Sequence, residues 1–258
     1  MIKVAVCGAL GRMGMTIGRI VNESPEFQLV GGVDLKPGSF YGVDVFESSK
    51  IDDFLALSKP DVVIDFTVAA AAVENIRAAA RHNASLIVGT TGFTDLQRAE
   101  IAQAVEGHVP AVISSNFSIG VNIFWQLVRE AARLLPEYDI EVTEAHHRYK
   151  KDAPSGTAKT ILQILDEELG QKKKQYGREG MMERGGEIGV HVIRGGDIVG
   201  DHSVLFAGNF ETIELAHRAY DRSVFAQGAV KAALWVVGKQ PGIYGMSDVL
   251  NLHGKSGR

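Results

Sequence analysis

The 258-residue sequence predicts an α/β protein with a doubly wound parallel sheet and a second, smaller α+β part with a mixed sheet. Three observations support this class. A glycine-rich turn joins an N-terminal strand pattern to a helix pattern, strand and helix patterns then alternate as far as residue 113, and further strand patterns cluster late in the chain. We therefore expect one domain from residues 1–117 and 224–258, and a second from residues 118–223.

The composition limits the class of partner. Hydrophobic residues make up 45% of the chain, and the formal charge of −4 argues against a surface devoted to nucleic acid. The single cysteine, Cys7, cannot form an intramolecular disulfide, which fits a reducing compartment. Since no hydrophobic run is long enough to span a bilayer and no targeting segment precedes the first strand, we expect a cytoplasmic protein without nucleic-acid or membrane partners.

The first strand, helix and second strand surround a glycine motif. Residues 2–6 are a β-branched run, and Gly8, Gly11 and Gly14 precede a helix pattern. Glycines at this spacing let the backbone approach a pyrophosphate at a helix N-terminus, although the spacing GxxGxxG taken alone is weak. The next strand pattern, at 27–33, ends in Asp34, where a ribose hydroxyl would bind, and Lys36 could hold a 2′-phosphate instead. The first domain is thus expected to be a Rossmann-type site for NADH or NADPH.

The alternation of strands and helices continues beyond a segment at 37–59 that has the composition of a linker, with a short helix pattern at 51–57. Ligands in such sheets lie beyond the carboxyl ends of the strands, where small and hydroxylic residues recur in this chain. For Thr90 and Thr91, helix capping and turn formation are as plausible as cofactor contact when each loop is taken alone. The predicted elements are strands at 61–66, 85–89 and 109–113 and helices at 69–82 and 95–105, and the strand-end segments are Phe66–Thr67, Gly89–Gly92 and Ser114–Phe117.

The second region begins with a long amphipathic helix pattern at 118–135, in which Ile119, Ile123, Leu127 and Ala131 share one face. The run of lysines at 172–174 is interpreted as a solvated surface feature. The other elements predicted here are strands at 139–144, 190–193, 203–206 and 212–216 and helices at 157–169 and 223–237.

The segment at 141–158 concentrates chemically active side chains after a strand. A single histidine at such a place is more often structural than functional, but His146 and His147 lie beside several cations and before a helix start at Ser155, Gly156 and Thr157. Adjacent histidines cannot easily share one zinc ion, so no metal is expected. The pattern predicts a proton donor beside a site for a small carboxylate.

This segment, EVTEAHHRYKKDAPSGTA, resembles the signature of the 4-hydroxy-tetrahydrodipicolinate reductase family, which belongs to the diaminopimelate route to lysine. The likeness extends over the whole chain and includes GALGRMG at 8–14, GTTG at 89–92, NFS at 116–118, RGGDIVGD at 194–201 and HRAYDRSVFAQGA at 217–229. It implies an NAD(P)H-dependent reduction of a small dicarboxylate that releases water, in a homotetramer assembled through the sheet of the second domain. It identifies His146 and Lys150 as catalytic, with Lys150 also binding substrate.

The resemblance also assigns binding residues. Substrate contacts are expected from His147, Lys150, Ser155, Gly156 and Thr157, and cofactor contacts from Gly8, Ala9, Leu10, Gly11, Arg12, Met13, Asp34, Lys36, Phe66, Gly89, Thr90, Thr91, Ser114, Ser115, Asn116 and Phe117. Some relatives carry Glu-Arg where this chain has Asp34-Leu35-Lys36, so the choice between NADH and NADPH stays open. Tyr149 replaces a histidine frequent in relatives. Two alternatives also stay open: a reductase of another small dicarboxylate, and a non-catalytic dinucleotide sensor.

Overall fold

The computed structural model describes residues 1–252, and its chain divides into two compact units. Unit 1 comprises Met1–Ile119 and the segment from Ser223 onwards, and unit 2 comprises Gly120–Arg222. Positions 253–258 of the predicted segment 224–258 lie outside the described residues.

Unit 1 is built around an eight-stranded sheet with the order β13-β7-β6-β5-β1-β2-β4-β3. All neighbours pair in parallel except β3 and β4, which are antiparallel. The chain crosses over between strands through helices, so the sheet is doubly wound about β1. The elements are β1 Ile2–Cys7, α1 Arg12–Glu23, β2 Phe27–Asp34, β3 Gly38–Phe40, β4 Val43–Glu47, η1 Ser48–Lys50, α2 Ile51–Ser58, β5 Val62–Asp65, α3 Ala69–Arg81, β6 Ser85–Val88, α4 Asp95–Val105, β7 Pro110–Ile113, α7 Ser223–Val236, β13 Gly242–Tyr244 and α8 Met246–Val249.

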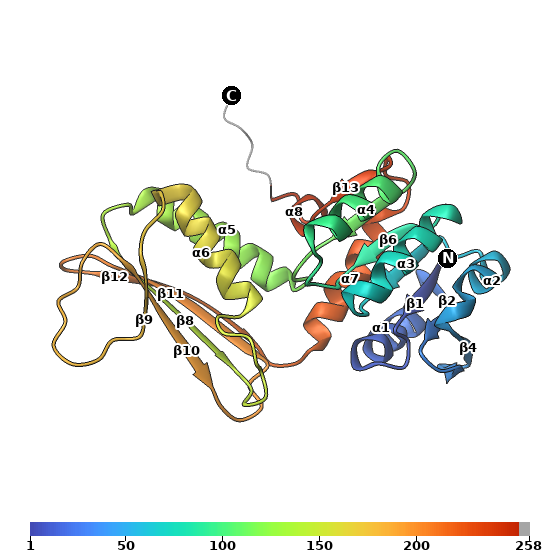
Figure 1. The fold of residues 1–258 in the computed structure, drawn as a ribbon, viewed down its shortest axis with the longest axis horizontal. Coiled ribbons are helices and arrows are strands. Elements are labelled where there is room, and N and C mark those ends of the chain that lie inside the picture. The colour runs from blue at the N-terminus through green and yellow to red at the C-terminus, as the bar shows by residue number, and fades with distance from the viewer. Residues whose placement is uncertain (253–258) are drawn as a thin grey trace. The chain divides into compact units, whose positions relative to one another are not determined.

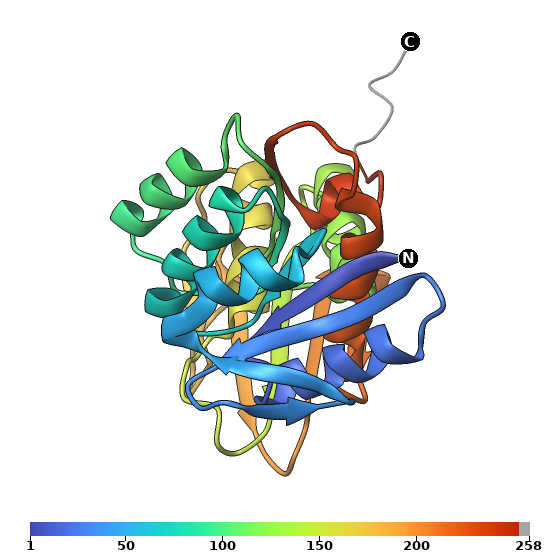
Figure 2. The same cartoon turned by 90° about the vertical axis from the view of Figure 1, so that its right-hand side faces the viewer.

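Helices cover both faces of this sheet, as Figure 2 shows with α3 and α4 in green tones on one side and α1 and α7 in blue and red on the other. β1 contributes Val4 and Val6 to the core shared with α1 and α7, and Ala5 and Cys7 to the core shared with α2, α3 and α4. A strand buried on both faces reads as a continuous apolar run, which is why its position was evident from the sequence. Burial raises the pKa of the Cys7 thiol, so Cys7 is a neutral packing group.

Unit 2 has a five-stranded mixed sheet with the order β12-β11-β8-β10-β9. β10 pairs in parallel with β8 and β9, whereas β11 pairs antiparallel with β8 and β12. Helices α5 and α6 lie on one face of it (Figure 1), where they bury Phe124, Val128, Ile161 and Leu165 against the strands. The elements are α5 Ile119–Leu134, β8 Asp139–His146, α6 Gly156–Leu169, β9 Lys174–Tyr176, β10 Ile188–Arg194, β11 Gly200–Ala207 and β12 Thr212–Ala219. The two units confirm the predicted fold class.

Three interpretations of the sequence were wrong in detail. Residues 37–59 are not a linker, because β3, β4 and η1 occupy the first part and β4 extends the sheet beside β2, whereas the short helix predicted at 51–57 is confirmed as α2. These strands are short and only partly buried, so they leave no long apolar run to detect. The lysine run at 172–174 is not wholly solvated, since Lys174 begins β9 and forms an ion pair with Asp166.

The core face of α5 also differs from the expected stripe. The structure buries Val121, Phe124 and Val128, whereas Ile123 and Leu127 are exposed within the described chain. Both stripes are apolar, so periodicity shows that the helix is amphipathic without showing which apolar stripe packs against the sheet.

Candidate functional site

The glycine turn of unit 1 is shaped for close approach of a ligand to its backbone. Gly8 has a φ of +74°, a conformation that favours glycine, and a Cβ at Gly14 would overlap the carbonyl oxygen of Gly8. The N-cap of α1 is Gly11, which carries no side chain to cap the helix. The first N–H groups of α1 and its dipole are therefore suited to the phosphates of a dinucleotide, and the turn fits that cofactor.

Asp34 lies at the end of β2, and its carboxylate organises this turn. Its Oδ2 accepts a hydrogen bond of 2.8 Å from the backbone N–H of Leu10, and its Oδ1 accepts one of 2.7 Å from Leu35. The predicted ribose-binding carboxylate thus also ties the glycine turn to β2. Two cations that adjoin these elements are exposed: Arg12 is the first residue of α1, and Lys36 follows the end of β2.

Asp65, at the end of β5, is a buried carboxylate that the sequence reading did not single out. It accepts hydrogen bonds from the backbone N–H and hydroxyl of Thr67 at 3.0 and 2.8 Å, from the Asn75 amide at 2.7 Å and from the Thr90 hydroxyl at 2.8 Å. Thr90 also donates to the backbone oxygen of Thr67 at 3.1 Å. The Thr90 hydroxyl therefore joins two strand-end loops, while Thr91 is exposed.

The remaining strand-end residues of unit 1 form a packed layer. The Phe66 and Phe117 ring centroids are 5.6 Å apart, and a Cβ at Gly89 would overlap the Phe66 ring. Phe117 is buried, so its ring is part of this packed layer. Ser114 donates to the backbone oxygen of Asn116 at 2.9 Å, and Asn116 accepts at 2.8 Å from the N–H of Ser118. Ser115 is exposed on the same turn.

In unit 2, His146 is the last residue of β8, and Glu144 precedes it on the same face of the strand. The alternation of β8 buries Ile140, Val142, Glu144 and His146 together. Nδ1 of His146 lies 2.5 Å from Oε2 of Glu144, whose side chain is 0% exposed. A Cβ at Gly200 would lie 3.1 Å from Nε2 of His146, so glycine at this position leaves room around that nitrogen.

Glu144 binds two further groups besides His146. Arg194 donates to both of its oxygens, from Nη1 at 2.8 Å and from Nη2 at 2.9 Å, and the backbone N–H of Ser155 donates to Oε1 at 2.9 Å. Burial raises the pKa of Glu144, but the hydrogen bonds from His146, Arg194 and Ser155 outweigh it and lower the pKa to about 2. Glu144 is therefore ionised at neutral pH.

A second histidine, His202 of β11, packs edge-on against His146 with ring centroids 5.1 Å apart. Its Nε2 lies 3.1 Å from the hydroxyl of Ser155. Burial, and next the neighbouring His146, lower the pKa of His202 to about 3. Since His202 is neutral at physiological pH, His146 is the better candidate of the two for a proton donor.

The loop from β8 to α6 carries the other predicted substrate residues. Lys150 Nζ donates to Asp152 Oδ1 at 2.8 Å, and its side chain is 22% exposed. Ser155 is the N-cap of α6 and accepts from the N–H of Ala158 at 3.2 Å, so Gly156 and Thr157 form the first turn at the positive end of the helix dipole. His147 is partly exposed. The fold thus places a histidine, a lysine and a helix N-terminus along one short loop.

Sequence reasoning gave no role in the site to Glu144, Arg194 or His202. A signal existed for Glu144, because a carboxylate at a core position of a period-2 strand requires a partner. For Arg194, which follows Glu144 by 50 positions, only the pairing of β10 with β8 brings the two side chains together.

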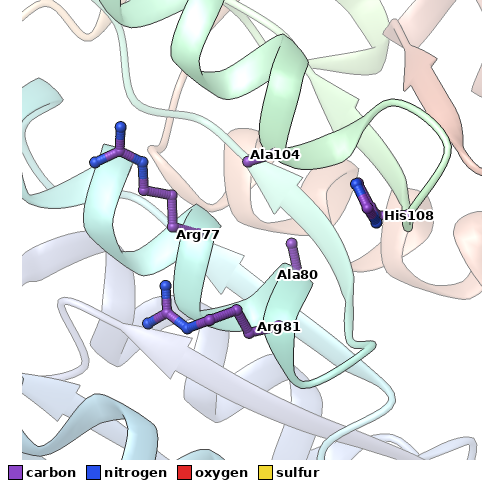
Figure 3. A pocket seen from close by; sticks show the side chains of 5 residues that line it. All are labelled: Arg77, Ala80, Arg81, Ala104 and His108. Carbon is purple, nitrogen blue, oxygen red and sulfur yellow. The ribbon is translucent and has the colours of Figure 1, made fainter.

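A separate pocket lies between α3 and α4 in unit 1 and is lined by Arg77, Ala80, Arg81, Ala104 and His108. Figure 3 shows both arginine side chains directed away from His108. Arg77 forms ion pairs with Glu74 and Glu100, and Arg81 forms one with Asp52. Both guanidinium groups therefore already have carboxylate partners, and the pocket is not a candidate anion site.

Within residues 1–252, no group of three or more His, Cys, Asp or Glu side chains is arranged to hold a metal ion. Over the same residues, no helix has the length and hydropathy needed to cross a bilayer.

Two family models match the chain and together cover most of it. The model described as "Dihydrodipicolinate reductase, N-terminus" matches residues 2–117, and "Dihydrodipicolinate reductase, C-terminus" matches residues 120–250. The curated 4-hydroxy-tetrahydrodipicolinate reductases of Methanoregula boonei and Methanoculleus marisnigri are each 72% identical over 252 residues, which is 98% of this chain and 99% and 100% of theirs.

Solved structures agree with these matches. A dipicolinate-bound dihydrodipicolinate reductase from Paenisporosarcina sp. TG-14 has a TM-score of 0.80 and 28% identity, covering 95% of this chain and 97% of its own. The diaminopimelate (DAP) dehydrogenase of C. glutamicum, at 16% identity and a TM-score of 0.58 over 95% of this chain and 92% of its own, shares the fold.

Proposed function

Because the chain belongs to the dihydrodipicolinate reductase family, it is an oxidoreductase of the diaminopimelate route to lysine, and we propose which of its residues carry out the reaction. The reaction converts 4-hydroxy-tetrahydrodipicolinate to tetrahydrodipicolinate, adding one hydride and one proton as water is lost. A reduced nicotinamide dinucleotide supplies the hydride when bound. The chain must therefore supply a proton and hold a dicarboxylate.

His146 is the proposed proton donor. Its Nδ1 is engaged by the ionised Glu144, so Nε2 is the ring nitrogen from which a proton can pass to the substrate. A side chain at position 200 would crowd this nitrogen, because a Cβ there would lie 3.1 Å from it. This local geometry is the observation that supports the proposal, because it pairs a buried histidine with an ionised carboxylate through one ring nitrogen.

Lys150, His147 and the first turn of α6 form the proposed dicarboxylate site. The Lys150 ammonium donates a hydrogen bond to Asp152. If it donated to a substrate carboxylate instead, the ammonium would still be paired with a negative charge. Ser155, Gly156 and Thr157 add the N-terminus of a 14-residue helix, whose dipole favours an anion. In this proposal Lys150 also assists protonation of the substrate.

The cofactor site is proposed on unit 1, at the glycine turn and at the loops that follow β5, β6 and β7. Asp34 could bind ribose hydroxyls, while Arg12 and Lys36 could bind a 2′-phosphate, so either NADH or NADPH fits the residues present. Phe66, Gly89, Thr90, Thr91 and the turn at 114–117 border the nicotinamide end in this proposal.

Assembly as a homotetramer in the cytoplasm is part of the proposal. The face of the unit 2 sheet opposite α5 and α6 carries a row of small and apolar side chains from paired strands, among them Thr143, Ala145, Ser203 and Leu205. A second copy of this chain would pack against this row through a self-complementary contact, in which the same patch serves on both copies. Sedimentation equilibrium tests this part, and a monomer at micromolar concentration would contradict it.

The decisive experiment is an assay of the purified protein with freshly prepared product of aspartate semialdehyde and pyruvate condensation, following oxidation of NADH and NADPH. We expect turnover, and we expect His146→Gln and Lys150→Ala each to lower it by more than about tenfold. Lys159→Ala, an exposed lysine on α6, is the control and should behave like the wild type. Wild-type rates for both site variants would refute the assignment of these residues.

A further inference from the structure

A single buried carboxylate contacts both halves of the proposed substrate site. We propose that Glu144 is the positioning residue of this site: it holds the His146 ring with Nδ1 protonated and, through the Ser155 N–H, keeps the N-terminus of α6 at a set distance from that ring. The inference rests on the proposed role of His146 as proton donor.

The hydrogen-bond pattern of Glu144 leaves little freedom for another arrangement. Its Oε2 accepts hydrogen bonds from His146 Nδ1 at 2.5 Å and from Arg194 Nη1 at 2.8 Å. Its Oε1 accepts hydrogen bonds from the Ser155 N–H at 2.9 Å and from Arg194 Nη2 at 2.9 Å. A carboxylate offers about four lone-pair sites, so this one is saturated. Each oxygen therefore couples one functional element, the ring or the helix start, to the same guanidinium.

The protonation of His146 follows from that of its partner. An ionised carboxylate only accepts hydrogen bonds, so Nδ1 must be the donor in this contact. When the ring is neutral its single proton lies on Nδ1, and when the ring is charged the second proton lies on Nε2, from which it can be transferred. Without the carboxylate, the Nε2–H tautomer becomes available and the charged ring loses a buried counter-ion.

Arg194 supports this arrangement from β10. Its bidentate contact keeps Glu144 charged, and Nη2 also donates to the backbone oxygen of Asp152 at 2.7 Å, within the loop that carries Lys150. Among the described residues, the charged and titratable side chains that contact His146 or its partner Glu144 are Glu144 itself on β8, Arg194 on β10 and His202 on β11. The charge of Lys150, on the loop, also acts on His202.

The first experiment uses the wild-type protein labelled with ¹⁵N-histidine, and His146→Gln assigns the His146 signals. We expect the neutral ring to show a protonated Nδ1 and an unprotonated Nε2. A neutral ring protonated on Nε2 would overturn the inference.

The second experiment compares Glu144→Gln with Glu141→Gln. Glu141 lies on the same strand and also binds a histidine, His191, at 2.7 Å, but it faces the other side of the sheet, so it is the matched control. For Glu144→Gln we expect kcat at pH 8 to fall at least tenfold, and the alkaline limb of its pH profile to move to lower pH, so that part of the loss is recovered at pH 6. Glu141→Gln should leave the position of that limb unchanged.

If the role of Glu144 were purely structural, Glu144→Gln would lose the same fraction of kcat at every pH. That result would also overturn the inference. If Glu144→Gln does not fold, Glu144→Asp, which keeps the charge on a shorter side chain, should retain the Nδ1–H tautomer and the position of the alkaline limb while kcat falls. Full activity of His146→Gln would refute the proton donor itself and leave the tautomer result standing, so the two failures are distinguishable.

Discussion

Replacing His202 with glutamine should make unit 2 less sensitive to acid. His202 is buried against His146 and the Ser155 hydroxyl, and burial lowers its pKa from 6.5 to about 3. Between these two values the unfolded chain binds a proton at this histidine and the folded chain does not. The stability that neutral His202 provides is therefore complete above pH 6.5 and is lost as the pH falls towards 3.

The size of the effect follows from the number of protons involved. One proton bound only by the unfolded chain lowers the free energy of unfolding by about 1.4 kcal/mol per pH unit. Glutamine can place its Nε2 near the Ser155 hydroxyl but does not titrate. The difference in unfolding free energy between the wild type and His202→Gln should thus shift by about 2 kcal/mol in favour of the variant between pH 6.0 and 4.5.

The two tryptophans of the chain allow this measurement to be confined to unit 2. Trp125 lies on α5 and Trp235 on α7, so in a Trp235→Phe background urea unfolding followed by fluorescence reports on Trp125 alone. Ser155→Ala is the matched control, because it removes the same hydrogen bond and the N-cap of α6 but no titrating group. It should lower stability by about 1 kcal/mol at every pH. If the unfolding free energies of the wild type and His202→Gln changed with pH in parallel, that result would refute the argument.

Three further outcomes are expected in unit 1. Gly14→Ala would force a Cβ into the carbonyl oxygen of Gly8 and should weaken NADPH binding more than tenfold in a fluorescence titration; wild-type affinity would show that the turn does not hold the cofactor. Gly228→Ala would put a Cβ into the backbone oxygen of Phe117 and should lower the free energy of unfolding by about 2 kcal/mol or more, even though alanine favours a helix by about 1 kcal/mol relative to glycine. A variant that is more stable in urea unfolding would contradict the clash. Asp65→Asn presents an amide to four donors and should weaken NADPH binding several-fold, and an unchanged Kd would show that the loops it joins are not part of the cofactor site.

Elements with strong local signals were predictable from the sequence. The helix Asp95–Val105 was predicted with the bounds that the structure has, and it begins with a capping box between Thr94 and Gln97. β1 and β5 were evident because strands buried on both faces are continuously apolar. β4 and β9 were missed because they are short and carry polar residues on their exposed positions.

The candidate site was predictable only in part, because its local residues and its long-range contacts depend on different information. The order strand, two histidines, lysine and helix start is a local pattern, and it puts the proposed proton donor and the proposed anion site within one segment. Glu144, whose carboxylate binds His146, is only two positions away in the sequence. Its importance depends on its burial, which is a property of the folded chain.

The sequence by itself determined the fold class, the family and the segment proposed to carry the chemistry, because periodicity, turn residues and motif spacing are local properties. Only the tertiary structure decided that Glu144 lies at the centre of that segment's contacts. The pairing of Ile193 with Ala145 and of Arg194 with His146 sets the register of β10 on β8, and this register brings Arg194 to Glu144. Register depends on the packing of whole strands against a core, so residues 50 positions apart meet without any local sign of it.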